Sequence, residues 1–249
     1  MRISCYFNKW AAMAVAVVCS MGLQSCLDDD DDYSYGKMIP NALVTVKPLE
    51  GNSYFLQLDD STTLLPVNVT SSPYGDKEVR ALVNYEEVDQ ASTGYSKAIH
   101  INWIDSILTK PIAPDLNADN DSVYGTDPVE IINDWVTIAE DGYLTLRFRT
   151  AWGNQQKHFV NLLVRKDSDN PYEVEFRHNA FGDVYGEYAD GLVAFKLDQL
   201  PDTQGKVVKL KLKWKSFSGD KSAEFNYCTR KSTPAKAAIT AGKYVLELK

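Results

Sequence analysis

The sequence has few of the residues that build metal and nucleophile sites. Its 249 residues include only three histidines and four cysteines. It lacks the His-Glu-x-x-His zinc motif, a Cys-x-x-Cys pair, the Gly-x-Ser-x-Gly turn of serine hydrolases and a phosphate-binding loop. These absences predict a non-enzymatic protein with no catalytic residue, no metal and no cofactor.

Positive charge is also scarce, since 26 basic residues stand against 34 acidic ones and give a net charge of −8. A chain of this sign has no general attraction for phosphate backbones, so nucleic acid is not an expected partner. The composition, 44% hydrophobic and 24% charged, is typical of a folded globular chain and excludes wholesale disorder. Aromatic residues make up 11%, which favours β structure over a helical bundle.

Long hydrophobic runs are missing. The apolar stretch 11–23 has only 13 residues, whereas a helix that spans a bilayer needs about 20. With Arg2 and Lys9 before it, the stretch is typical of a signal peptide over residues 1–25. It ends in Leu-Gln-Ser-Cys26, which resembles a bacterial lipobox. That resemblance implies cleavage before Cys26 and attachment of lipid, including palmitate, to Cys26; the alternative is a plain secretory signal with a chance cysteine.

A run of five carboxylates follows the lipobox and belongs to an expected acidic tether over residues 26–36. Like charges this close repel one another and cannot pack, so the tether is expected to be solvated. Calcium binding is an alternative that a flexible tether serves poorly. An acidic run directly after the lipidated cysteine resembles the surface-export signal of lipoproteins in the Bacteroidota. It implies a protein anchored in the outer membrane and displayed at the cell surface through Asp28, Asp29, Asp30, Asp31 and Asp32.

Residues 37–112 alternate between apolar and polar side chains in a way that predicts strands and no helix. A sheet of only five strands must close on itself to bury both its edges and its core. This predicts a five-stranded barrel of the OB type. In the fourth strand, Ala81 and Val83 are expected inside and Arg80 outside. The five strands are expected at 42–47, 53–59, 62–67, 78–88 and 95–108.

Residues 113–127 break this pattern with proline, glycine and aspartate, and they predict a linker. The start Asp115-x-Asn117-x-Asp119 copies the first ligands of an EF-hand loop. The rest of the segment does not match the EF-hand motif, because Asn120 stands where the loop needs glycine and Thr126 stands where it needs glutamate. A solvated linker is therefore favoured over a calcium site.

Residues 128–249 hold eight candidate strands, which suit an immunoglobulin-like β-sandwich. Asp141-Gly142 is a strong hairpin signal. In the strand 206–215 the apolar residues alternate with four lysines, which either guard an exposed sheet edge, the favoured reading, or bind an anionic glycan. The fold class is therefore all-β, an OB-like barrel followed by a sandwich. The four lysines are Lys209, Lys211, Lys213 and Lys215.

Few other residues in the second domain suggest a site. His178, Asn179 and Asp183 stand close together at a strand exit, as a turn or, alternatively, a ligand cluster. Trp152 precedes Gly-Asn in a turn and is expected to be exposed, which is weak support for sugar binding. Cys228 is expected to pack as a small apolar residue, because the mature chain has no second cysteine to pair with it.

Three short Asp-hydroxyl-apolar motifs resemble the O-glycosylation motif of envelope proteins in the Bacteroidota. They centre on Ser61, Ser106 and Ser122. We expect Ser122 to be the modified residue if any is, because it lies in the expected linker, where exposed backbone can enter a transferase.

Several longer strings resemble the NigD-like lipoproteins. They are the start Cys-Leu-Asp-Asp-Asp-Asp-Asp, Tyr-Phe-Leu-Gln-Leu-Asp-Asp from Tyr54, Asp-Gly-Tyr-Leu-Thr-Leu-Arg-Phe from Asp141, and Glu-Phe-Arg-His-Asn-Ala-Phe-Gly-Asp from Glu175. The resemblance implies the same barrel and sandwich in an outer-membrane lipoprotein, and it carries over no catalytic residue. We expect a surface binding or accessory module with a protein or glycan partner; the alternative is a bacteriocin immunity protein.

Overall fold

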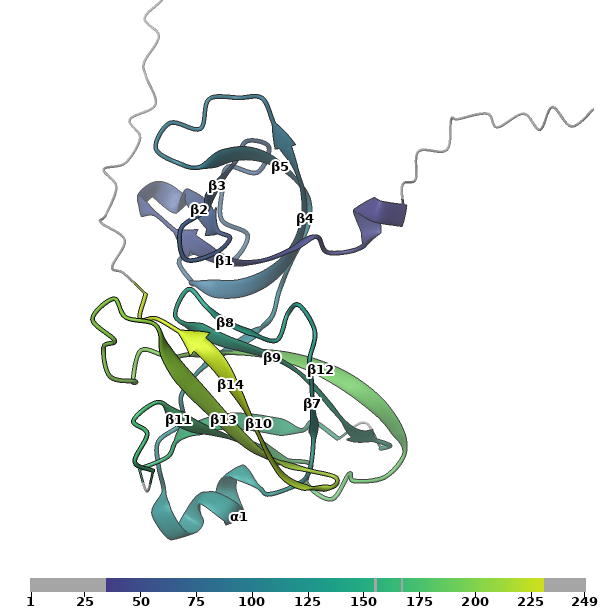
Figure 1. Ribbon diagram of the computed structural model, residues 1–249. Helices are drawn as coiled ribbons and strands as arrows, with labels where there is room; N and C mark the ends of the chain where they lie inside the picture. Colours follow the sequence, from purple (N-terminus) through teal and green to yellow (C-terminus); the bar gives the residue numbers. More distant parts are fainter. Residues whose placement is uncertain (1–34, 155, 167, 231–249) are drawn as a thin grey trace, which may run out of the picture. The chain divides into compact units, whose positions relative to one another are not determined.

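The computed structural model describes residues 35–154, 156–166 and 168–230 (Figure 1). From Gly36 onward these residues belong to one compact unit, which contains a closed five-stranded barrel and a β-sandwich of two sheets. The predicted mostly-β architecture is confirmed. The signal peptide, Cys26, the aspartate run and the strand expected at 244–248 lie outside the described residues.

The barrel closes in the order β1-β2-β3-β5-β4, which Figure 1 shows as a ring. Its β3 and β5 are parallel and the other pairs are antiparallel. Two 3-10 turns, η1 (Tyr35–Met38) and η2 (Glu50–Asn52), accompany the strands. The interior is filled by alternate residues such as Val44, Leu56, Leu64, Val83 and Ile99, all fully buried, as the OB prediction requires. The strands are β1 (Ala42–Pro48), β2 (Tyr54–Gln57), β3 (Thr63–Pro66), β4 (Val79–Val88) and β5 (Lys97–Ser106).

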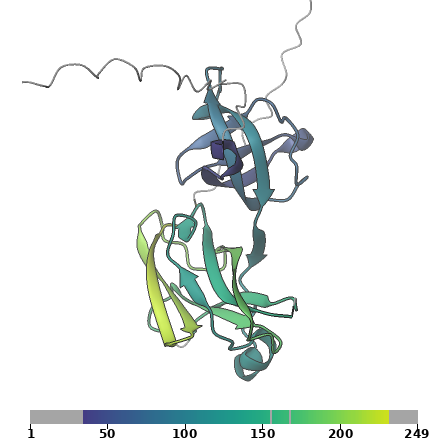
Figure 2. The ribbon, with the colours of Figure 1, turned by 90° about the vertical axis from the view of Figure 1, so that its right-hand side faces the viewer.

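The segment after the barrel is folded onto the sandwich. Strand β6 (Leu108–Pro111) pairs in parallel with β12, and η3 (Asn117–Asp119) leads into α1 (Asn120–Tyr124). In Figures 1 and 2, α1 lies at one end of the sandwich. Tyr124 is buried, and its hydroxyl donates to the carbonyl oxygen of Pro114 at 2.7 Å. The stretch 113–127 thus holds local structure and a buried anchor.

The sandwich consists of one sheet in the order β10-β11-β13-β14 and another in the order β6-β12-β9-β7, with β8 also pairing with β9. Leu144, Leu162 and Phe176 are among the residues packed between the sheets. Asp141 and Gly142, both at positive φ, form the predicted turn before β9. The remaining strands are β7 (Glu130–Ile132), β8 (Ile138–Glu140), β9 (Tyr143–Trp152), β10 (Phe159–Val164), β11 (Glu173–Asn179), β12 (Glu187–Lys196), β13 (Val208–Ser216) and β14 (Gly219–Tyr227).

Strand β13 shows the predicted alternation of apolar residues and lysines, but the lysines do not have the role that was favoured for them. Leu210, Leu212 and Trp214 are buried. The strand lies between β11 and β14, so its lysines do not guard a sheet edge, and that interpretation is wrong. Alternation reports which face of a strand is buried, but it carries no information about neighbouring strands.

The outer face of the barrel at β1 and β4 is covered by residues of the sandwich. Leu43 and Ile107 pack with Val136, Tyr143 and Ala194 in a separate buried cluster. Arg80, expected outside, is fully buried. Its side chain does point away from the barrel core, as the alternation predicts. It is buried because residues 140–145 cover it there, as its contacts with Glu140 and Thr145 show.

Candidate functional site

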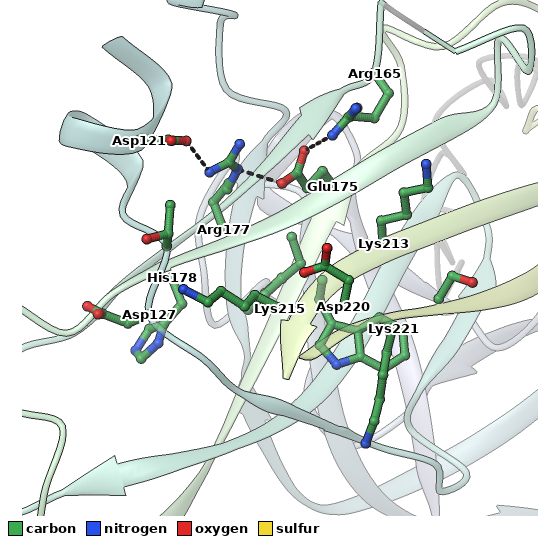
Figure 3. A pocket seen from close by; sticks show the side chains of 14 residues that line it. Asp121, Asp127, Arg165, Glu175, Arg177, His178, Lys213, Lys215, Asp220 and Lys221 are labelled. Atoms are coloured by element: carbon green, nitrogen blue, oxygen red, sulfur yellow. Dashed lines mark hydrogen bonds and ion pairs between the residues drawn. The ribbon is translucent and has the colours of Figure 1, made fainter. Parts of the chain in front are cut away.

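A charged groove of about 690 Å³ lies over strands β11, β13 and β14 (Figure 3). A cavity of this volume is within the usual range for ligand sites. Its charged lining residues come from the α1 segment, the strands and the β13–β14 hairpin. The cations are Arg165, Arg177, Lys213, Lys215 and Lys221, and the anions are Asp121, Asp127, Glu175 and Asp220.

A chain of ion pairs crosses one side of the groove. The Arg177 guanidinium lies 2.6 Å from Asp121 Oδ1 and 2.8 Å from Glu175 Oε1, and Glu175 in turn pairs with Arg165 at 2.6 Å (Figure 3). Arg177 is thereby held between α1 and its own strand. These charges neutralise one another, so this side is preorganised but has little net attraction for an ion.

The lysine stripe is also largely paired. Lys211 and Lys213 lie 3.3 and 2.6 Å from the carboxylate of Glu173, a residue that is almost fully buried. Burial opposes ionisation of Glu173, but hydrogen bonds from Lys213 and Lys211 hold its pKa below the ordinary value. Lys209 donates to Asn226 Oδ1 at 2.9 Å.

Free donors remain at one end of the stripe. Lys215 is exposed and has no ion pair with the described residues. The buried indole nitrogen of Trp214 has no hydrogen-bond partner in the described part of the chain. Both residues line the groove, and the exposed Lys215 ammonium is free to donate to a ligand with hydrogen-bond acceptors there.

The three residues predicted as one cluster have separate roles. Asn179 Oδ1 accepts from the backbone N–H of Phe181 at 3.0 Å, and the Asp183 N–H donates to Ala180 O at 3.0 Å. Phe181 is at positive φ between them. Asn179 is therefore a turn residue, which is the reading that the sequence favoured.

Asp183 and His178 instead join a buried group centred on His158. The Asp183 carboxylate accepts from the Gly153 and Asn154 N–H groups at 2.9 and 3.2 Å, and it lies 3.4 Å from His158 Nε2. His158 Nδ1 is 3.0 Å from His178 Nε2. The group ties the loop after β9 to the turn after β11. No local pattern in the sequence pairs His158 with His178, because register across the sheet brings them together.

The protonation of this group follows from burial. Burial and the neighbouring His158 lower the pKa of His178 to about 4, so His178 is neutral at pH 7. Burial opposes ionisation of Asp183, but the backbone N–H groups and His158 keep its pKa below the ordinary value. The neutral His178 ring supports the loops structurally and adds no positive charge to the groove.

Ser122 is exposed on α1, and its hydroxyl donates to the Asp119 carbonyl oxygen at 3.0 Å. Its neighbour Asp121 pairs with Arg177. Modification of Ser122 therefore stays a prediction, now placed on a short helix at the rim of the groove. Ser61 and Ser106 are exposed as well, so exposure does not separate the three motifs.

A second cavity, about 590 Å³, opens among β6, β9, β10 and β12. Trp152 lines it and is 47% exposed, which confirms the exposure expected of that residue. Phe159 and Phe181 nearby are half exposed and were not singled out from the sequence. The run Phe159–Val164 is mostly apolar, so its pattern does not reveal which side chains face solvent.

Comparison with known proteins relates both domains to one family. Residues 43–107 match the NigD-like N-terminal OB domain, and residues 111–227 match the NigD-like C-terminal beta sandwich domain. No curated protein matches the chain. Among the described residues, no helix is long and apolar enough to cross a membrane.

Solved structures agree with this assignment. A toxin-related protein from Parabacteroides distasonis is 40% identical over 76% of this chain and 92% of its own, with a TM-score of 0.65. A protein of unknown function from Bacteroides vulgatus is 26% identical over 75% and 89%, with a TM-score of 0.62. A NigD-like immunity protein from Bacteroides caccae, 20% identical over 75% and 96% with a TM-score of 0.54, shares the fold. With its OB barrel, its β-sandwich and these relatives, the chain belongs to the NigD-like family.

Proposed function

We propose that this protein is a non-enzymatic, lipid-anchored protein of the outer membrane that binds a protein or glycan partner at the cell surface. The observation that carries the binding role is the open groove, in which the exposed Lys215 has no ion pair among the described residues and lies beside the unpartnered indole of Trp214. The lipobox at Cys26 and the aspartate run support the location.

The groove suits a partner rich in hydrogen-bond acceptors. Paired side chains such as Arg177 and Lys213 have few rotamers left to lose, so binding costs them little conformational entropy. Sugar hydroxyls, glycan carboxylates and acidic protein side chains all present suitable acceptors to Lys215.

The groove is tested with Lys215→Glu, and Lys77→Glu on an exposed barrel loop is the matched control. The full chain carrying Cys26→Ala is applied to arrays of envelope glycans and to blots of outer-membrane proteins. We expect saturable binding that falls at least tenfold in Lys215→Glu and is unchanged in Lys77→Glu. Equal binding by both variants would remove the groove from the proposal.

The location is tested with Cys26→Ala in the native host. Removal of residues 1–25 takes away Arg2 and Lys9 and leaves a net charge of about −10, which disfavours an anionic leaflet, and no helix of the described residues could span a bilayer. We expect the variant to move from the membrane pellet to the soluble fraction. Recovery in the pellet at the wild-type level would contradict lipid anchoring.

Bacteriocin immunity is the second candidate. The observation that favours it is the 40% identity with a protein described as toxin-related. Deletion of the gene followed by challenge with bacteriocins of related strains separates the two functions. At least tenfold lower survival, restored by the wild-type gene and not by Cys26→Ala, supports immunity. Unchanged survival supports the binding or accessory role.

A further inference from the structure

The second cavity is a cleft between the two sheets of the sandwich, beside the edge strand β10. Its lining is mostly apolar, with Phe148 and Val160 on the inside and the small residues Ala189 and Gly191 contributed by β12. A Cβ on Gly191 would lie 2.5 Å from the Phe148 ring, so this ring packs directly on the strand backbone. The absence of large side chains on this part of β12 leaves the cleft open.

Two exposed rings at the mouth of the cleft are already held in place. The Trp152 indole N–H donates to Gln156 O at 2.9 Å. Phe159 meets Phe181 edge-on, with ring centroids 5.1 Å apart and an interplanar angle of 89°. Exposed apolar patches of this kind mark interaction sites, and such aromatic residues dominate protein interfaces. Rings that are fixed beforehand lose little entropy on binding.

The polar side chains of the lining are mostly satisfied within the protein. Lys110 Nζ donates to Val160 O and Asn161 Oδ1 at 2.6 and 2.8 Å. The Asp190 carboxylate is held by Arg147 and Arg149, each at 2.6 Å. A buried sugar would leave several hydroxyls without partners, at a cost of about 1–3 kcal/mol each. The cleft therefore favours an apolar side chain over a sugar.

The charge at the rim of the cleft indicates which kind of partner residue would lie beside the apolar side chain in the cleft. Lys157 is exposed and has no ion pair with the described residues, so a carboxylate can approach it. A membrane is a poor fit, because the apolar lining behind the exposed rings is concave and a bilayer surface does not fill it. The net charge of −8 also disfavours an anionic leaflet.

We propose that this cleft docks a protein partner, which inserts one large apolar side chain between Trp152 and the β12 floor and places an acidic residue near Lys157. The inference rests on the proposed binding role and deepens it, because it names a protein as the partner at a site separate from the charged groove.

The probe is an acetylated Glu-Trp-Glu amide, titrated into the isotope-labelled full chain carrying Cys26→Ala and followed by amide NMR. We expect saturable shifts at the Gly191 amide and the Trp152 indole N–H. The Glu-Ala-Glu peptide is expected to bind at least tenfold more weakly. Ala189→Leu, which fills the cleft, is expected to weaken binding of the tryptophan peptide to the same degree.

Two further variants keep the test decisive. Trp152→Ala removes an exposed ring without filling the cleft, and it should also weaken binding at least tenfold even if Ala189→Leu does not fold. Trp135→Ala is the matched control, because Trp135 is similarly exposed and does not line the cleft, so binding should be unchanged.

Three outcomes overturn the proposal. The first is equal affinity for the tryptophan and alanine peptides. The second is the same set of shifts from maltohexaose and none from the tryptophan peptide, which would make the cleft a sugar site. The third is the same pattern from vesicles of phosphatidylethanolamine and phosphatidylglycerol. Lys215→Glu in the charged groove should leave peptide binding intact, so failure of the groove and failure of the cleft are distinguishable.

Discussion

Arg80 has no exposed surface, although it is a charged residue. Its guanidinium donates to Thr45 and Thr145 hydroxyls at 3.0 and 3.4 Å and lies 3.4 Å from Glu140 Oε2. Burial lowers the pKa of Arg80 and raises that of Glu140, so loss of hydration outweighs the mutual attraction at both groups. The pair therefore contributes little net stability, but neither member tolerates the loss of the other.

Arg80→Ala is expected to lower the free energy of unfolding by about 3–5 kcal/mol, because it leaves Glu140 without its cation and opens a cavity. Lys97→Ala is the control, since the Lys97–Glu87 pair is exposed and screened by solvent, so its loss should change stability much less. Urea unfolding of the two variants measures the difference. Equal losses would contradict the account of Arg80.

His178 makes stability depend on pH. Its pKa is about 4 in the folded chain, whereas that of an unfolded histidine is near 6.5. Between these values the unfolded chain binds a proton that the folded chain does not. The free energy of unfolding is therefore fully retained above pH 6.5 and falls as pH drops toward 4, by on the order of 3 kcal/mol.

Urea unfolding at several pH values between 7.5 and 4.5 checks this prediction. His178→Gln keeps a hydrogen-bonding side chain that does not titrate, so its stability should change less over the same range. An identical slope in the variant and the wild type would assign the pH dependence to other groups.

At the scale of strands, β9 and β12 pack closely because one position in β12 is a glycine, which has no side chain. The two strands pair through ten residue pairs, and Gly191 lies opposite Phe148. Because a Cβ at position 191 would lie 2.5 Å from the Phe148 ring, the glycine is required by packing.

Gly191→Ala is expected to destabilise the protein by about 1–3 kcal/mol through overpacking. Phe148→Leu removes the clashing ring, so the double variant should lose less stability than the two single losses combined. A double-mutant cycle by thermal or urea unfolding measures this coupling. Additive losses would show that Phe148 moves freely aside.

Strands were predictable where one face is apolar and the ends carry turn residues. Strand β13 and the Asp141-Gly142 turn have such local signals, and both are present. Strand β6 has no alternation in its four residues and was missed, because its strand state depends on pairing with β12, about 80 residues later in the chain. Helix α1 was missed because its five residues are too short to show a period.

At the scale of the whole molecule, polar contacts join the barrel to the sandwich. Lys47 Nζ lies 2.8 Å from Asp141 Oδ1, and both side chains are buried. The Tyr143 hydroxyl donates to Glu78 at 2.6 Å. Burial and Glu78 raise the pKa of Tyr143, so this hydroxyl keeps its proton. These contacts extend the cluster around Arg80.

Replacement of the five aspartates 28–32 with alanine is expected to change sorting without changing folding. Five adjacent carboxylates repel one another and are not expected to pack in a core, so the free energy of unfolding should stay within about 0.5 kcal/mol of the wild-type value. Protease treatment of whole cells should cleave the variant less than the wild type, because fewer molecules reach the surface. Unchanged accessibility would leave the run as a solvated spacer.

The sequence by itself determined the fold class, the order of barrel and sandwich and most strands, because alternation and turn residues act locally. The likeness to the NigD-like family came instead from longer strings of residues. Tertiary structure decided which polar faces are buried, because Arg80 and Lys47 leave solvent only when another domain covers them. It also decided the sites: pairing across the sheet joins His158 to His178, and the open edge of the sandwich places Phe159 beside Trp152. These features depend on residues far apart in the chain, and no local pattern records such distances.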